Sequence, residues 1–101
     1  MRLPSRTKLA AEYVLLAKKR RVEGLPVYGD FDPDTDTRNL SREAILEDVD
    51  VHNYLHFQKI KFPELHEMNL KAKRQAFELY VTLRHLEEME KELTIKIGGA
   101  A

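Results

Sequence analysis

The sequence predicts an all-α protein, an antiparallel bundle of about three helices. Apolar residues recur at helical spacing in three segments, residues 5–23, 38–61 and 63–93. A loop rich in glycine, proline and aspartate, residues 24–37, separates the first two segments. No alternation of strand-like and helix-like segments is present. With 101 residues, a single domain covering 1–101 is expected.

The first segment carries its apolar residues on one side: Leu9, Tyr13, Leu16 and Ala17. Ser5 or Thr7 can cap its amino end, since a hydroxyl oxygen can accept from a backbone N–H of the first turn. Four cationic residues lie in its last turns, where they suit the negative end of the helix dipole: Lys18, Lys19, Arg20 and Arg21. We expect Gly24 to end this helix.

The loop 24–37 contains alternating aspartates between Asp30 and Asp36. Counted from Asp32, acidic residues occupy positions 1, 3, 5 and 12 of a calcium-loop pattern, the last being Glu43. Position 6 is Thr37 instead of glycine, and position 8 is Asn39 instead of an apolar residue. The alternative is a turn in which aspartates accept hydrogen bonds from nearby backbone and Asp36 or Thr37 caps the next helix.

The second segment carries three carboxylates on one narrow stripe. At about 100° per residue, Glu47 and Asp50 lie within about 40° of Glu43. The opposite side carries Ile45, Val49 and His52, which suit a core. Like charges at this spacing repel weakly, so we expect a positive partner. That partner is either Arg or Lys from a neighbouring helix, which would make the stripe a salt-bridge seam, or Mg²⁺ with phosphate oxygens.

The third segment begins at Pro63 and has a heptad pattern, with five residues spaced by seven: Leu65, Ala72, Leu79, Leu86 and Leu93. Ala76 and Leu83 fill the other seam position, which Asn69 and Glu90 interrupt. A helix of this length would span about 45 Å, more than a compact domain of this size. We therefore expect the helix 63–93 to pack against a second copy, giving a homodimer or a higher oligomer.

The stretch REAILEDVDVHNYL resembles the metal-binding helix of the MazG-like all-α nucleotide pyrophosphohydrolases, a family that includes small, often phage-associated chains. Its E-x-x-D is Glu47 to Asp50, followed one turn on by Asn53 and Tyr54. The resemblance covers about residues 25–60. The family's E-x-x-E on the preceding helix has no counterpart here, while Glu64 and Glu67 form one after the E-x-x-D.

The resemblance implies Mg²⁺-dependent hydrolysis of a nucleoside triphosphate to a monophosphate and pyrophosphate, or a degenerate nucleotide-binding scaffold. Glu47 and Asp50 would be metal ligands, and Glu43 a third ligand or a base that orients water. Asn53 would contact the nucleotide, and Lys59 or Lys61 its phosphates. Whether the chain is an enzyme stays open, and the alternative is a non-enzymatic helical interaction or adaptor protein.

The remaining signals limit the alternatives. His52 and His56 are spaced to share a zinc ion, but no third ligand is evident. Lys and Arg balance Asp and Glu at 17 each, which makes nucleic acid an unlikely partner. No apolar run reaches the roughly 20 residues of a membrane span, and the amino-terminal stretch lacks the apolar core of a signal peptide. With no cysteine, the sequence fits a cytoplasmic protein.

Overall fold

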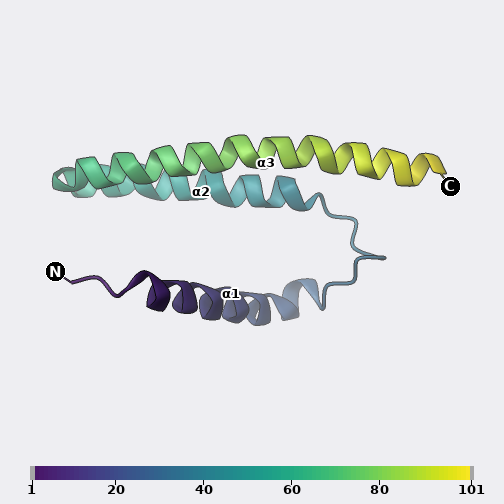
Figure 1. The fold of residues 1–101 in the computed structure, drawn as a ribbon, viewed down its shortest axis with the longest axis horizontal. Helices are drawn as coiled ribbons and strands as arrows, with labels where there is room; N and C mark the ends of the chain where they lie inside the picture. The colour runs from purple at the N-terminus through teal and green to yellow at the C-terminus, as the bar shows by residue number, and fades with distance from the viewer. Residues whose placement is uncertain (1, 101) are drawn as a thin grey trace. The chain divides into compact units, whose positions relative to one another are not determined.

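The computed structural model describes residues 2–100, with the side chains of residues 2–27 and 29–96. It contains the helices α1 (Arg6–Tyr28), α2 (Leu40–Lys61) and α3 (His66–Ala100), with a short 3₁₀ helix, η1 (Pro63–Leu65), before α3 (Figure 1). No strand occurs in the described range, so the all-α prediction is confirmed. The chain divides into two compact units, one ending at Asp36 and the other starting at Thr37.

The first unit consists of α1 and the acidic turn. Ser5 caps α1 as expected, its hydroxyl oxygen accepting from the Lys8 N–H at 3.3 Å. The expected end at Gly24 is wrong, because the helix continues through Pro26 to Tyr28. It ends at Gly29, whose φ of +71° is a conformation that residues with a side chain rarely adopt.

The acidic turn after α1 is organised by Asp32. Its carboxylate accepts from the Asp34 N–H at 2.9 Å, and its carbonyl accepts from the Thr35 and Asp36 N–H groups. Asp32 therefore uses its side chain to hold a local turn, as the turn interpretation expected for these aspartates.

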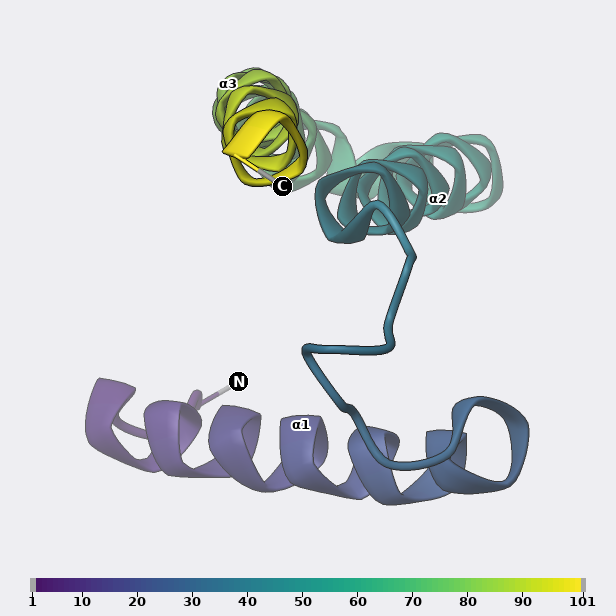
Figure 2. The same cartoon turned by 90° about the vertical axis from the view of Figure 1, so that its right-hand side faces the viewer.

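The second unit is a hairpin in which α2 and α3 run antiparallel and side by side (Figure 2). Asp36 or Thr37 was expected to cap α2, but this is wrong. The cap is Asn39, whose side-chain oxygen accepts from the Arg42 N–H at 2.9 Å. At the other end, Pro63 starts η1 as predicted, and its fixed φ suits the first position of a helix. The turn is short enough to hold α2 and α3 together.

The core of the hairpin is small and contains Ile45, Ala76 and Leu83. The heptad pattern of α3 divides between two sides of this helix. The position of Ala76 and Leu83 faces α2, and Asn69 at the same heptad position is buried with them. The leucine row beside it stays 44–58% exposed: Leu65, Leu79, Leu86 and Leu93.

Candidate functional site

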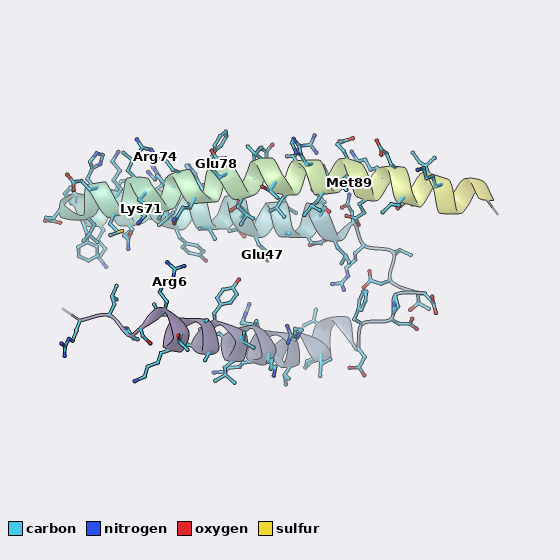
Figure 3. The ribbon with its side chains drawn as sticks, viewed as in Figure 1. Arg6, Glu47, Lys71, Arg74, Glu78 and Met89 are labelled. Atoms are coloured by element: carbon cyan, nitrogen blue, oxygen red, sulfur yellow. The ribbon has the colours of Figure 1, made fainter. Side chains whose placement is uncertain are left out.

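The predicted acidic stripe lies on the side of α2 that points away from α3, where Glu47 can be seen (Figure 3). Glu43, Glu47 and Asp50 are all exposed, while Ile45 and Asp48 between them face the hairpin interface. No ion pair in the described part of the chain involves any of the three stripe carboxylates. Their charges are therefore compensated only by solvent within this unit.

The structure brings only part of the predicted nucleotide site together. Asp50 and Asn53 line one shallow depression of about 260 Å³ on α2, with Tyr54 and Phe57. Lys59 and Lys61 lie in the last turn of α2, about 14–17 Å beyond Asp50 along the helix axis. Within residues 2–100 no three His, Asp or Glu side chains are arranged to hold a metal ion. The helix dipole alone already favours Glu43 at the start of α2 and the two lysines at its end.

In contrast to the stripe, the buried carboxylate of Glu87 on α3 is fully compensated. It is 1% exposed and accepts from Arg42 on α2 through Nε at 2.8 Å and Nη2 at 2.7 Å. Arg84, one turn earlier on α3, also pairs with it. The hydrogen bonds from Arg42 lower the pKa of Glu87 below its usual value. This cluster joins the two helices, and no buried side-chain nitrogen or oxygen of the described residues is left without a hydrogen-bond partner.

Glu90, one turn further along α3, caps the start of α2. Its carboxylate accepts from the backbone N–H groups of Leu40 and Ser41, each at 3.1 Å, and from the Ser41 hydroxyl. The first N–H groups of a helix have no acceptor within the helix, so this carboxylate replaces one. The hydrogen bonds, chiefly from the Ser41 hydroxyl, lower the pKa of Glu90.

Asn69 joins the helices near the turn of the hairpin. It is 3% exposed, and its side-chain amide donates to the Leu55 carbonyl at 2.7 Å and to the Gln58 side chain at 3.2 Å. The two residues that interrupt the heptad pattern, Asn69 and Glu90, thus make polar contacts near opposite ends of the hairpin. Both contacts fix the register of α2 against α3.

A groove between α2 and α3 was not expected from the sequence. It has a volume of about 320 Å³, and its lining contains seven residues: Asp48, Val49, His52, Lys73, Ala76, Phe77 and Tyr80. Asp48 is not part of the acidic stripe predicted from the sequence. Its spacing from Ile45 and His52, three and four residues away, is the signal that places it on the side facing α3.

The two histidines considered for zinc have different surroundings. Both are exposed, but His52 lines the groove, whereas the ring centroid of His56 lies 5.9 Å from that of Phe57. No third ligand joins them in residues 2–100.

No protein-family model matches the chain, and neither a curated protein nor a solved structure matches it. Of the helices described in residues 2–100, none combines the length and the apolar character that crossing a membrane requires.

Proposed function

We propose that this chain is a helical nucleotide-binding protein of the MazG-like type, with Mg²⁺ held on the outer side of α2. The observation that supports it best is the contrast between the carboxylates of the hairpin. Glu87 and Glu90 are compensated by groups of the opposite helix, whereas Glu43, Glu47 and Asp50 have no such partner in this unit. Mg²⁺ typically needs only one or two carboxylates, because water molecules and phosphate oxygens of the ligand supply its other ligands.

In this proposal, Glu47 and Asp50 bind Mg²⁺ and Glu43 is a third ligand or orients the attacking water. Asn53 contacts the nucleotide, because it shares a depression with Asp50. Lys59 and Lys61 can reach phosphates only of a ligand that extends along α2. The ion would polarise a phosphoryl group and position a water molecule for pyrophosphate release. The cytoplasm is the proposed location, which suits both nucleotide substrates and a chain without cysteine.

A nucleotide panel tests this proposal. We expect nucleoside triphosphates with Mg²⁺ to raise the melting temperature of the wild type, and the shift to be lost in Glu47→Gln. Glu78→Gln is the matched control, since Glu78 is an exposed glutamate of α3 away from the stripe (Figure 3). Pyrophosphate release measured on the same samples separates an enzyme from a scaffold that only binds. If no nucleotide shifts the wild type at millimolar concentration, the proposal is refuted.

A second candidate function, an oligomeric helical interaction protein, is supported by the leucine row of α3. Leu79 and Leu86 remain 49% and 46% exposed although the heptad position beside them is buried against α2. A row of this kind fits a second copy of the chain, packed as in a coiled coil.

Sedimentation velocity tests the self-association. We expect the wild type to be a dimer or larger and Leu86→Glu to shift it to monomer. Leu46→Glu is the control, because Leu46 is similarly exposed, at 52%, but lies on α2 away from the row. A wild-type monomer at high protein concentration would exclude this interface.

A further inference from the structure

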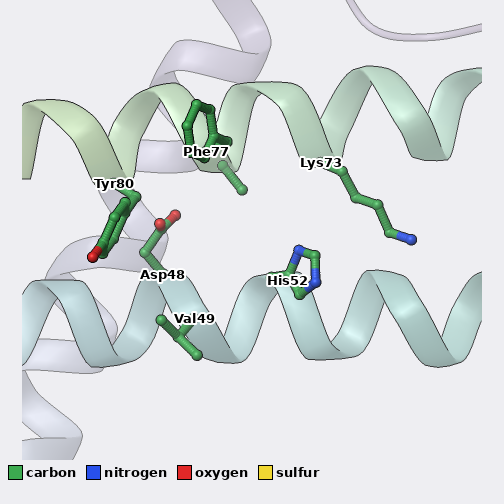
Figure 4. A pocket seen from close by; sticks show the side chains of 7 residues that line it. Asp48, Val49, His52, Lys73, Phe77 and Tyr80 are labelled. Atoms are coloured by element: carbon green, nitrogen blue, oxygen red, sulfur yellow. The ribbon is translucent and has the colours of Figure 1, made fainter.

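The groove between α2 and α3 carries charges that neither helix satisfies. Val49, Ala76, Phe77 and Tyr80 form its walls, so most of its surface is apolar. Asp48 lies at one end, beside Phe77 and Tyr80, and Lys73 and His52 lie at the other (Figure 4). This site is separate from the acidic stripe, which lies on the other side of α2.

Asp48 is the feature of the groove that points to a ligand. It is 6% exposed, and it makes no hydrogen bond or ion pair with any described residue. The other two buried polar residues of the hairpin, Asn69 and Glu87, each have partners. No fully buried side-chain oxygen of the described residues lacks a hydrogen-bond partner, so the Asp48 oxygens open to solvent in the groove, where a cationic group of a ligand can reach them.

Lys73 limits which cation can do so. Its side chain is half-buried in the same groove and makes no ion pair with a described residue. It lies near His52, which is one helical turn from Asp48, a separation of about 6 Å along the axis. A ligand that is only cationic would be repelled at the Lys73 end, and one that is only anionic at the Asp48 end.

We propose that this groove binds a small zwitterion with an apolar body. Its ammonium group donates to the Asp48 carboxylate beside the Phe77 and Tyr80 rings, and its carboxylate accepts from Lys73. The flat apolar part fills the space between Val49 and Phe77. Charge-assisted hydrogen bonds at both ends give orientation, and the apolar walls give contact area. Aromatic rings next to the ammonium add a cation–π attraction.

Four related probes test the charge pattern by isothermal titration calorimetry: 4-(aminomethyl)benzoate, benzylamine, benzoate and benzyl alcohol. The first carries both charges on one ring, and the others lack one or both. We expect 4-(aminomethyl)benzoate to bind at least about tenfold more tightly than either singly charged probe, since one charge-assisted hydrogen bond contributes that much. Equal binding of all four, or no saturable binding of any, would overturn the proposal.

Two variants assign the ends. Asp48→Asn keeps the shape of the side chain but removes its charge. It is expected to weaken the binding of 4-(aminomethyl)benzoate and benzylamine about tenfold and not to weaken the binding of benzoate. Lys73→Met is expected to weaken the binding of 4-(aminomethyl)benzoate and benzoate but not that of benzylamine. Because Lys73 is only half-buried, this second test does not require a substitution at a buried position. Glu78→Gln is the control and should change none of them.

Circular dichroism checks that each variant keeps its helices. Sedimentation velocity tests whether a second copy of the chain occupies the groove instead of a small molecule. If the wild type binds no probe and both Asp48→Asn and Lys73→Met dissociate an oligomer, the partner of Asp48 is a second copy of the chain. If no probe binds and the variants leave the oligomeric state unchanged, the groove holds neither a small zwitterion nor a second copy of the chain. Either result overturns the zwitterion site.

Discussion

Replacing Ile45 with alanine tests whether the small core holds the hairpin together. Ile45 is 2% exposed, and the substitution removes three carbon atoms from the interface of α2 and α3. At about 0.8 kcal/mol for each buried CH₂ group, the loss of burial alone costs about 2.4 kcal/mol. The remaining cavity adds to this, and buried isoleucines replaced by alanine typically cost about 2–5 kcal/mol. Because a two-helix unit can relax around the gap, we expect a loss of about 2–3 kcal/mol.

Ile60 provides a control in the same helix. It is 68% exposed, so the same substitution removes little buried area. Alanine also favours the helix more than isoleucine does, by a few tenths of a kcal/mol. We therefore expect Ile60→Ala to change the free energy of unfolding by less than about 0.5 kcal/mol.

Urea unfolding followed by circular dichroism measures both variants. A unit of this size has a total stability of only about 3–10 kcal/mol, so the loss at Ile45 is a large fraction of it. Equal losses at Ile45 and Ile60 would refute the packing of α2 against α3. A loss at Ile60 that grows with protein concentration would instead show that another chain covers it.

Three further predictions follow from the polar contacts and from the end of α1. The free energy of unfolding should fall as acid protonates Glu87 and Glu90, because the pKa values of both carboxyl groups are lower in the folded state. Their contribution to stability is present above the unfolded-state pKa of about 4.3. It is lost as the pH drops through the folded-state pKa values. Glu87→Gln should flatten this acid dependence in urea titrations at several pH values, and an unchanged slope would contradict the Arg42 cluster. Asn69→Ala should cost about 1–3 kcal/mol in the same assay, since it removes two buried hydrogen bonds, and a neutral result would mean that this contact is not formed. Gly29→Ala should cost about 1–3 kcal/mol because of the backbone angle alone, since no atom lies within 4 Å of the added carbon. NMR chemical shifts should show a loss of helical structure in the last turn of α1. Unchanged shifts there would refute the strained angle.

The helices themselves could be predicted from the sequence, but several of their ends could not. Spacing of apolar residues identified all three segments, because this pattern depends only on local geometry. Gly24 was expected to end α1, yet a glycine ends a helix only where the chain turns, and that happens at Gly29. Asn39 was missed as the cap of α2 because Asp36 and Thr37 are also favoured capping residues by type. The contact of Glu90 on α3 with the Leu40 N–H favours a start at Leu40.

The polar residues at the hairpin interface illustrate a second limit. In the sequence, Asn69 and Glu90 only weaken the heptad pattern of α3. The structure gives each a role, since their partners are backbone and side-chain groups of α2 that lie far away in the sequence. Asp48 was missed for the same reason: the stripe was defined by the carboxylates that share one side of α2, and the opposite side was interpreted as core.

The unequal lengths of α2 and α3 bear on what the hairpin needs beyond itself. The helix α2 has 22 residues and α3 has 35, and the polar contact of Glu90 marks where α2 begins. The part of α3 after Glu90 therefore extends beyond α2, which Figure 1 shows, and it still carries Leu93 and Ile95, 58% and 73% exposed. Most of the stability of a helix in a protein comes from the packing of its apolar face, and α2 does not supply this packing to the extension. Leu93 continues the leucine row of Leu79 and Leu86, and a second copy packed along that row would cover the extension as well. Leu93→Glu should therefore dissociate the oligomer in sedimentation velocity, as Leu86→Glu does, and should also lower the helix content measured by circular dichroism.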